Sequence, residues 1–324
     1  MNIIIFGGSG FIGSNLCHQL NDGYHFTIFD KVKRHFDKYF FVMGDIQTTI
    51  CLSGAEKFDA IVNLAAEHAD NVSPKSLYRS VNVGGAINVC NFARANGIKK
   101  IIFTSSVAVY GVAPIGADES APINPFNEYG ITKFQAEEVY REWFNESPSD
   151  RVLTIIRPTV VFGPGNRGNV FNLFRQIFEG KFIMIGPGLN SKSMAYVDNI
   201  AAFIKYALQF NKGYYIFNYA DKPDYTMKDL VAKIRSLAPH KRLLSISLLP
   251  SYIPYWLGLS IGSLFELSSA LSGKKFAISR VRVKKFCMNS VYVSNVSGLS
   301  FVAPVSLEDG IKATIESEFL SGQE

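Results

Sequence analysis

The sequence lacks most features that mark secreted, disordered or repetitive proteins. Its four cysteines are scattered without a CxxC pair, so we expect small buried thiols in a reducing compartment, no disulfide and no metal site; they are Cys17, Cys51, Cys90 and Cys287. Charged residues make up only 19% of the chain and hydrophobic residues 48%, which excludes disorder. No basic region precedes the apolar start MNIIIFGGSG, and we therefore expect no signal peptide.

Acidic residues are fewer than basic residues. Lys and Arg number 33 and Asp and Glu 27, which gives a net charge of +6 and a pI near 9.0 and favours anionic partners. The chain has no basic tail and no basic helix with interleaved aromatic residues, so we do not expect nucleic acid among them. Phosphorylated small molecules or lipid headgroups fit the composition better.

What is present is an alternation of short apolar runs and longer amphipathic stretches. Six runs read as strands buried on both faces, at residues 2–6, 25–30, 38–45, 58–66, 99–106 and 151–159. Helical patterns lie between several of them, notably Ser76–Asn96 and Glu128–Phe144. This order predicts an α/β fold, with a Rossmann-type doubly wound parallel sheet and right-handed crossovers.

The first strand runs directly into a glycine-rich loop, GGSGFIGSNL. Its glycines recur every third residue between a strand and a helix, which is the context of a dinucleotide-binding turn. Glycine lets backbone N–H groups approach a pyrophosphate, and the helix N-terminus stabilises the anion. We therefore predict cofactor contacts from Gly7, Ser9, Gly10, Phe11, Ile12 and Gly13.

Asp30 ends the second strand and bears on which dinucleotide binds. A carboxylate here accepts hydrogen bonds from the ribose hydroxyls and repels a 2′-phosphate, which favours NAD. Lys31, Lys33 and Arg34 follow at once and can receive that phosphate, so NADP stays open.

The later strands supply the remaining predicted cofactor contacts. Asp45 and Ile46 follow the third strand, where the adenine would lie, and small side chains follow the fourth, where the cofactor passes close to the backbone. The other predicted positions are Leu64, Ala65, Ala66, Asn82, Tyr129, Lys133 and Pro158. Because Gly- and Pro-rich loops follow, we assign residues 1–160 to the NAD-binding Rossmann domain. Residues 161–324 are assigned to a smaller α/β substrate-binding domain, interleaved with the last Rossmann strands.

The stretch NEYGITKFQAEE carries the candidate catalytic residues Tyr129 and Lys133. Their i, i+4 spacing places both side chains on one face of a helix. An adjacent ammonium favours the phenolate and lowers the tyrosine pKa, as would the positive nicotinamide of NAD⁺. The phenolate can then take a proton from a carbinol while hydride leaves for the cofactor. The same spacing also arises by chance on a helix with a solvated lysine.

Two serines give this pair its context. Ser105 and Ser106 lie at the carboxyl end of a predicted parallel strand, where open α/β sheets bind ligands. A hydroxyl there can hydrogen-bond the reacting oxygen, and we assign that role to Ser106. We expect Ser105 to satisfy backbone groups.

Together these motifs resemble the extended short-chain dehydrogenase/reductase superfamily, which contains NAD-dependent sugar epimerases and dehydratases. The resemblance rests on the glycine loop, Asp30, NLAAEH, SSVAVYG, the Tyr–Lys pair, RPTVVFGPGNRGN and SMAYVDNIAAF, and covers essentially the whole chain. It implies Ser106, Tyr129 and Lys133 as the catalytic triad and a C-terminal domain that holds a sugar. AAEHADNVSPKSLYRSVNV, SMAYVDNIAAFIKY and ISRVRVKKFC resemble a bacterial subgroup of N-acetylhexosamine 4-epimerases. That subgroup includes enzymes acting on undecaprenyl-diphosphate-linked N-acetylglucosamine in O-antigen assembly.

Several reactions can be weighed against these residues. Sugar 4,6-dehydratases of the superfamily carry an Asp-Glu pair directly after the catalytic hydroxyl residue, but this chain has Val107 and Ala108, which disfavours dehydration. We favour a 4-epimerase of a diphosphate-linked N-acetylhexosamine. A NAD(P)H-dependent 4-keto sugar reductase needs the same triad and stays open. A 3β-hydroxysteroid-type dehydrogenase fits the loops less well, and a non-catalytic dinucleotide sensor on this fold typically lacks the tyrosine or the lysine.

The predicted substrate contacts are Ser106, His68, Thr159, Arg167, Lys192 and Arg282. Lys192 stands about where nucleotide-sugar epimerases of the superfamily carry an arginine beside uridine diphosphate. Lysine cannot form the bidentate hydrogen bonds of arginine, which weakens the assignment of a UDP-linked sugar. Together with the resemblance to the lipid-linked subgroup, this favours undecaprenyl diphosphate as carrier, and UDP stays open. The basic side chains among them, Arg167, Lys192 and Arg282, are equally compatible with solvated surface charges.

The stretch Tyr255–Lys285 begins almost without charge and ends wholly basic. Glu266 and frequent Ser and Gly disfavour a spanning helix. Either Tyr255–Leu271 is a core helix followed by a strand or loop that carries Arg280 and Arg282 to the diphosphate, or the segment also touches an anionic bilayer. We thus expect a cytoplasmic protein and leave open contact with the inner face of the cytoplasmic membrane. The resemblance further implies a homodimer formed through two helices, within Ser76–Asn96 and Phe126–Trp143.

Overall fold

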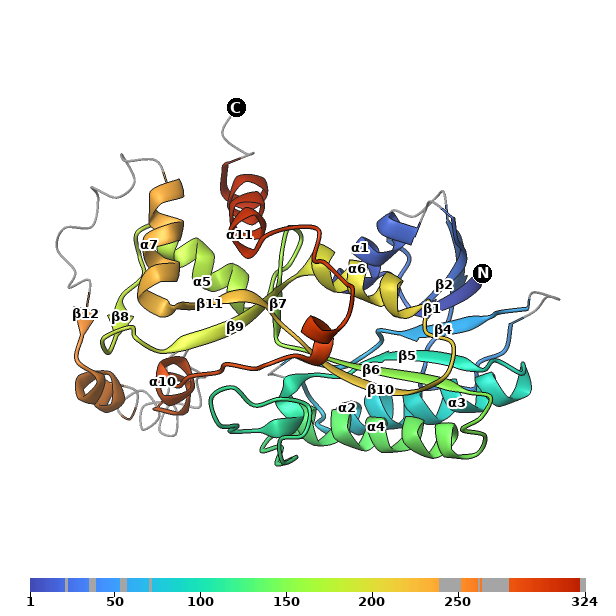
Figure 1. Cartoon of the computed structure of the whole chain (residues 1–324). Helices are drawn as coiled ribbons and strands as arrows, with labels where there is room; N and C mark the ends of the chain where they lie inside the picture. The colour runs from blue at the N-terminus through green and yellow to red at the C-terminus, as the bar shows by residue number, and fades with distance from the viewer. Residues whose placement is uncertain are drawn as a thin grey trace. The chain divides into compact units, whose positions relative to one another are not determined.

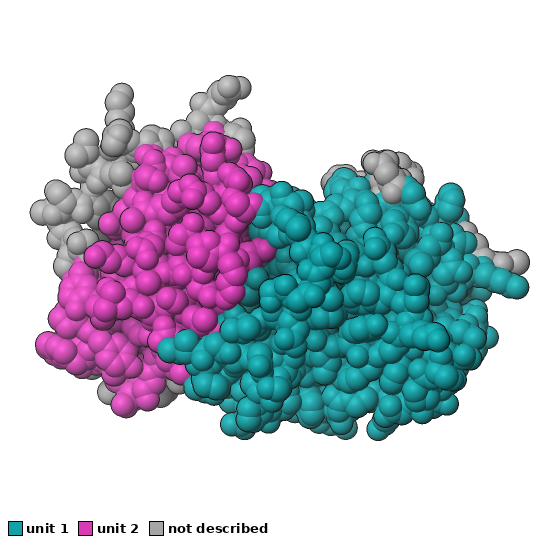
Figure 2. Space-filling view, viewed as in Figure 1, with its two compact units in different colours: residues 1–161, 195–220, 292–305 teal, residues 162–194, 221–291, 306–324 magenta. Residues whose placement is uncertain are grey.

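The computed structural model describes residues 1–20, 23–34, 39–52, 57–69, 72–238, 252–261, 263 and 280–320. The chain forms two compact units (Figure 2). Unit 1 comprises residues 1–161, 195–220 and 292–305, and unit 2 comprises residues 162–194, 221–291 and 306–324. Three separate segments therefore build each unit.

A seven-stranded parallel sheet forms the centre of unit 1, in the order β10-β6-β5-β4-β1-β2-β3 (Figure 1). The strands are β1 (Asn2–Phe6), β2 (His25–Asp30), β3 (Phe40–Met43), β4 (Ala60–Asn63), β5 (Lys100–Thr104), β6 (Val152–Pro158) and β10 (Gly213–Tyr219). The predicted doubly wound sheet is thereby confirmed. Its strand order reverses between β1 and β4, where open α/β sheets leave a crevice for ligands at their carboxyl ends.

Helices cover both faces of this sheet (Figure 1). On one face, Leu16 and Phe203 belong to a buried cluster with alternate β-strand residues; on the other, Val89 and Trp143 do the same. The helical elements of unit 1 are α1 (Phe11–Leu20), α2 (Ser76–Tyr78), η1 (Arg79–Gly84), α3 (Gly85–Ala95), η2 (Val107–Tyr110), α4 (Glu128–Asn145), α6 (Val197–Ala207) and η4 (Asn295–Gly298). The two faces of the parallel sheet are thus both buried, as its apolar strands predict.

Unit 2 combines short strands with packed helices. β9 pairs antiparallel with β11, which sets Lys192 opposite Tyr225, and β8 pairs parallel with β12. A helix at 255–261 packs on α10 through Gly258, where an added Cβ would lie 3.6 Å from Val283 Cγ1. The remaining elements are β7 (Val160–Phe162), α5 (Asn169–Phe178), β8 (Met184–Ile185), β9 (Ser191–Tyr196), β11 (Asp221–Thr226), α7 (Met227–Leu237), β12 (Tyr252–Ile253), α10 (Arg280–Cys287), α11 (Leu307–Ile315) and η5 (Glu316–Leu320). The chain passes between the units within β7 and β9, and again after residues 220, 291 and 305.

The strand or loop predicted for the basic segment is wrong, because Arg280–Cys287 is helical. Its RVRV alternation is typical of a strand, but Val283 and Cys287 are spaced i, i+4 and so lie on one face of a helix. Val283 is buried, and the Cys287 thiol donates to the Ile185 carbonyl at 3.3 Å. The burial of Val283 and the bond of Cys287 on the same helix face favour the helix over the strand.

Three further expectations need correction. The helix predicted over Ser76–Asn96 is interrupted by the π-helical turn η1. Cys17 and Cys90 are buried as expected, but Cys51 is exposed. The described start of the predicted core helix is helical but carries exposed side chains at Tyr255 and Trp256; residues 264–279 lie outside the described part of the chain.

Candidate active site

The glycine loop lies against the loop that follows β4. Gly7 has a φ of +77°, and a Cβ on it would lie 2.6 Å from the backbone nitrogen of Ala65. A Cβ on Gly13 would lie 2.6 Å from the carbonyl oxygen of Gly7. Only glycine allows both approaches, the first between two loops and the second between α1 and its own preceding turn. Two predicted cofactor segments are thus brought together at the carboxyl ends of β1 and β4.

Asp30 completes this corner of unit 1 from the end of β2. Its Oδ2 accepts a hydrogen bond from the Ser9 backbone N–H at 3.0 Å, and its Oδ1 accepts from Val32 N–H at 3.2 Å. The Ser9 hydroxyl is buried and has no hydrogen-bond partner in the structure. A buried hydroxyl in this position is an unmet polar group that a bound diphosphate can satisfy.

The other predicted cofactor positions also lie in unit 1. Leu64, Ala65 and Ala66 are half-buried after β4, and Ile46 is buried after β3. The Asp45 carboxylate accepts from the Gln47 backbone N–H at 2.9 Å and so shapes its own turn. The backbone cradle, the unpaired Ser9 hydroxyl and the acid at the end of β2 together fit a dinucleotide.

The Ser106 side chain lies close enough to Tyr129 to act on the ionisation of its hydroxyl, and it acts to lower the pKa of Tyr129 against the raising effect of burial. Ser106 ends the segment after β5 and caps η2, where its hydroxyl accepts from the Ala108 N–H at 3.2 Å. Tyr129 lies in the first turn of α4, because the Asn127 side chain caps this helix by accepting from Gly130 N–H at 2.8 Å. Two local caps therefore orient the serine and tyrosine hydroxyls.

Lys133 is almost completely buried one turn further along α4. Its ammonium donates to the carbonyl of Thr104, the last residue of β5, at 2.6 Å and lies 4.2 Å from the centroid of the Phe103 ring. Burial lowers the pKa of Lys133 to about 7, while the Glu137 carboxylate acts in the opposite direction. The lysine is therefore poised near its titration point at neutral pH.

The expected lowering of the Tyr129 pKa does not appear in this structure. Burial raises the pKa of Tyr129, and the nearby Ser106 side chain opposes this shift. Lys133 directs its ammonium to the Thr104 carbonyl instead. Ser105 also differs from expectation: its backbone N–H donates to the Ile156 carbonyl at 2.6 Å, but its buried hydroxyl has no partner.

Asn82 connects the π-helical turn η1 to the loop after β4. Its Oδ1 accepts from the Glu67 N–H at 2.8 Å, and its Nδ2 donates to the Glu67 carbonyl at 3.1 Å and to the Thr132 hydroxyl at 3.0 Å. One buried amide thus fastens a predicted cofactor loop to α4, which carries the candidate catalytic residues. Turns of this π type are frequent at functional sites.

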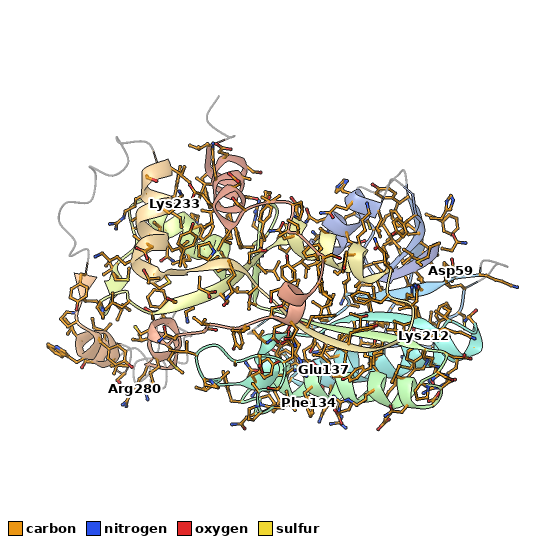
Figure 3. The ribbon with its side chains drawn as sticks, viewed as in Figure 1. Asp59, Phe134, Glu137, Lys212, Lys233 and Arg280 are labelled. Carbon is orange, nitrogen blue, oxygen red and sulfur yellow. The ribbon has the colours of Figure 1, made fainter. Side chains whose placement is uncertain are left out.

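The sequence did not predict the buried ion pair between Glu137 and Arg157. Glu137 lies on α4 (Figure 3) and Arg157 near the end of β6; neither side chain is more than 2% exposed. The spacing of Glu137, four residues after Lys133 on the same predicted helix, was the available signal. Nothing local in the sequence indicates its partner.

The predicted substrate residues are divided between the units. In unit 1, His68 is exposed and the Thr159 hydroxyl donates to the Tyr219 carbonyl at 3.1 Å. In unit 2, Arg167 pairs with Glu318 at 2.7 Å and Lys192 donates to the Met288 carbonyl at 2.8 Å. The side chain of Arg282 lies outside the described part of the structure. Substrate contact by these residues stays a prediction.

The fold and the tyrosine–lysine helix define a Rossmann protein of the short-chain dehydrogenase/reductase type. Residues 3–220 match the model of the NAD dependent epimerase/dehydratase family, and the chain belongs to this family. It is 47% identical over 322 residues to the N-acetyl-α-D-glucosaminyl-diphospho-ditrans,octacis-undecaprenol 4-epimerase of Escherichia coli O157:H7, covering 98% of this chain and 96% of that protein.

Solved structures of low sequence identity share the fold over the whole chain. The UDP-glucose 4-epimerase of Thermotoga maritima, solved with UDP-glucose, has a TM-score of 0.74 at 21% identity and covers 100% of both chains. The UDP-N-acetylglucosamine 4-epimerase of Bacillus cereus has a TM-score of 0.73 at 16% identity, with 98% of this chain and 99% of that chain covered.

Proposed function

We propose that the protein is an NAD-dependent 4-epimerase that interconverts N-acetylglucosamine and N-acetylgalactosamine on a diphosphate carrier, for O-antigen or other surface polysaccharide synthesis. The observation that carries the proposal is the 47% identity to the undecaprenol-linked 4-epimerase over 98% of the chain. The proximity of Ser106 to Tyr129 and the buried Lys133 support the chemistry that this reaction needs.

In the proposed reaction, side chains of the protein remove one proton from the sugar 4-hydroxyl and later return it. Bound NAD supplies the hydride acceptor and donor at C4. The Tyr129 phenolate takes the 4-hydroxyl proton and becomes a phenol, and it later returns that proton while Ser106 holds the same oxygen. Lys133 supplies a positive charge from a low-dielectric position, where charge acts strongly on its surroundings. Net oxidation is zero, because the hydride that leaves C4 returns to its other face.

The residues after Ser106 support epimerisation over dehydration. Val107 and Ala108 begin η2 and have no acidic or basic group. Glu119, in the loop that follows, has a structural role: its Oε1 accepts from the backbone N–H groups of Asn218 at 2.7 Å and of Asn295 at 2.8 Å. Water elimination needs an acid and a base beside the sugar, and these positions supply neither.

For the carrier we favour undecaprenyl diphosphate over UDP. The undecaprenol-linked 4-epimerase is more similar in sequence to this chain than the two UDP-sugar epimerases of known structure are. In addition, Lys192 supplies a point charge in place of a bidentate arginine. A nucleotide diphosphate gains specificity from such bidentate contacts, whereas a lipid-linked diphosphate can be held by charge and by the membrane.

The proposal is tested by offering UDP-linked and undecaprenyl-diphosphate-linked N-acetylglucosamine in parallel, without added cofactor. We expect conversion of the lipid-linked form by wild type and none by Tyr129→Phe, with both proteins equally folded. Conversion of the UDP form alone rejects the lipid carrier, and an absolute need for added NAD(P)H points to the 4-keto reductase. Inertness toward both substrates overturns the proposal.

We further propose that unit 2 touches an anionic membrane surface. Tyr252, Tyr255 and Trp256 are 48%, 40% and 67% exposed, and Arg280 and Lys284 are exposed one turn apart on the adjoining α10. Interfacial aromatic rings with basic residues favour anionic headgroups, by about 1 kcal/mol per cation near the surface. In the parts of the chain that the structure describes, no helix is long and apolar enough to span a bilayer.

Flotation with anionic liposomes at low salt tests this contact. We expect wild type to float, Trp256→Ala to float less, and high salt to release both. The matched control is Val302→Ala, since Val302 is an exposed apolar residue of unit 1. Wild type left at the bottom of the gradient rejects the contact.

A homodimer through α3 and α4 is part of the same proposal. Ile87 on α3 is 46% exposed and Phe126, just before α4, is 55% exposed, which gives this surface apolar residues to bury. Light scattering should give twice the chain mass for wild type and a smaller mass for Ile87→Lys. A monomeric wild type rejects the dimer.

A further inference from the structure

The Glu137–Arg157 pair is one part of a buried network that reaches both catalytic segments. Arg157 Nε and Nη2 donate to the two carboxylate oxygens of Glu137 at 2.9 and 2.6 Å. Arg157 Nη1 donates to the Tyr110 hydroxyl at 2.7 Å. Glu137 is on α4, the helix of the Tyr–Lys pair, and Tyr110 ends η2, the turn that Ser106 caps. One guanidinium therefore contacts the two elements from which the catalytic residues come.

The network also fastens these elements to the sheet. Arg157 is the penultimate residue of β6, directly opposite Asn218 of β10. The Tyr110 hydroxyl donates to Asn218 Oδ1 at 2.8 Å, and Asn218 Nδ2 donates to the Val293 carbonyl at 3.0 Å. A bidentate arginine–carboxylate pair fixes both distance and plane, and each group here has a hydrogen-bonded neighbour. The arrangement therefore allows little relative movement of η2 and α4.

We infer that Arg157, acting through Glu137 and Tyr110, is a positioning residue that holds Ser106, Tyr129 and Lys133 in register for proton transfer. The inference rests on the proposed function, since it concerns the same triad. Apolar residues of equal volume can often replace a buried ion pair without loss of stability. A role in stability alone therefore does not explain why Arg157 contacts both α4, through Glu137, and η2, through Tyr110.

Glu137 also acts electrostatically on the buried ammonium of Lys133, from one turn further along α4. Among the described groups, Glu137 is the charge that acts on Lys133. Its partner Arg157 lies on β6 and donates to Tyr110 of η2. Two other pairs lie towards the end of α4 and beyond it: Arg141 with Tyr214 of β10, and Arg94 of α3 with Glu146. Since Glu137 opposes the effect of burial on the Lys133 pKa, removing its charge lowers that pKa further. The alkaline limb of activity, along which Lys133 loses its proton, then moves to lower pH.

Tyr110→Phe tests the η2 arm without leaving a cavity or an unpaired ion. We expect kcat to fall by about tenfold to a hundredfold, with KM and bound NAD unchanged, because small misplacements of catalytic groups have effects of this size. The matched control is Tyr214→Phe, which removes a tyrosine hydroxyl that accepts from Arg141 Nε at 3.2 Å, a contact between β10 and α4 away from the triad. We expect its kcat to stay within twofold of wild type.

Glu137→Gln tests the α4 arm through its pH profile. We expect the alkaline limb to move to lower pH, and a difference titration of tyrosinate absorbance against the Tyr129→Phe background to show a changed Tyr129 ionisation. Should this variant fail to fold, Tyr110→Phe decides the question by itself.

Active wild type with unchanged kcat in Tyr110→Phe overturns the inference and leaves the proposed function standing. A loss of thermal stability with unchanged kcat also overturns it, because the network is then structural only. Wild type that converts neither substrate contradicts the proposed function itself, and the tyrosinate titrations still report whether the network acts on Tyr129.

Discussion

The backbone N–H of Ser9 donates a hydrogen bond to Oδ2 of Asp30 over 3.0 Å. The glycine loop and the acid after β2, which the sequence presents as two separate cofactor signals, are thus one hydrogen-bonded structure. Asp30 shapes the loop as well as offering oxygens to a ribose.

Replacing Asp30 should therefore weaken cofactor binding twice. We expect Asp30→Ala to lower NAD affinity by about 10-fold to 100-fold, since a hydrogen bond to a charged group contributes about 1.5–3 kcal/mol and the loop also loses its anchor. The measurement is a fluorescence or calorimetric titration with NAD. Equal affinity in variant and wild type would contradict a role for Asp30 in the site.

Gly13→Ala should remove cofactor binding by steric means. The new Cβ would lie 2.6 Å from backbone atoms of Gly7 and Gly8, neither of which can move like a flexible side chain. Gly84→Ala is the matched control, because the nearest atom to its Cβ is 3.9 Å away and its φ is −58°. We expect purified Gly13→Ala to carry no NAD and Gly84→Ala to carry the wild-type amount; similar NAD content in both contradicts the close packing of the loop.

The buried lysine should make stability depend on pH in a defined direction. Burial lowers the pKa of Lys133 from its ordinary 10.5 to about 7, so between these values the unfolded chain binds the proton that the folded chain has lost. Stability therefore rises with pH across this window, by up to about 1.4 kcal/mol per pH unit. Lys133→Met has no such titration. Denaturant unfolding of both proteins from pH 7 to 10 should show wild type gaining on the variant; parallel curves contradict the burial of the ammonium.

Glu146 should stabilise the far end of α4 in a pH-dependent way. Arg94 and Arg151 hold the pKa of Glu146 at about 2, below its ordinary 4.5. Its contribution is full above pH 4.5 and is lost as the pH falls to about 2. The carboxylate is 41% exposed, so we expect Glu146→Gln to lower the unfolding free energy at neutral pH by only about 0.5–1 kcal/mol. The difference from wild type should vanish near pH 2, and a difference that persists there contradicts the ion-pair explanation.

The sequence predicted those features of the fold and the candidate site whose signal lies within one short stretch. The apolar strands, the glycine loop and the i, i+4 pair each lie within one short stretch, and the structure brings Gly7 against Ala65 because parallel strands end at one edge of the sheet. The arrangement of the strands and of the loops that follow them is thus predictable from hydrophobic periodicity and chain order.

Features that depend on distant neighbours were not predictable in this way. The Thr104 carbonyl receives the Lys133 ammonium, and Arg157 meets Glu137 across 20 residues of sequence. The direction of the Tyr129 pKa shift follows from such burial and not from spacing. The helical state of Arg280–Cys287 likewise depends on its contact with β8, which the RVRV alternation does not reveal.

The central claim, that one hydride leaves C4 and returns to it within the site, is tested most directly with undecaprenyl-diphosphate-linked N-acetylglucosamine carrying deuterium at C4. Mass spectrometry of the released sugars should show N-acetylgalactosamine that retains the deuterium, in ordinary water and with no cofactor added. Product that has lost the label, or that forms only when NAD(P)H is supplied, would contradict the account.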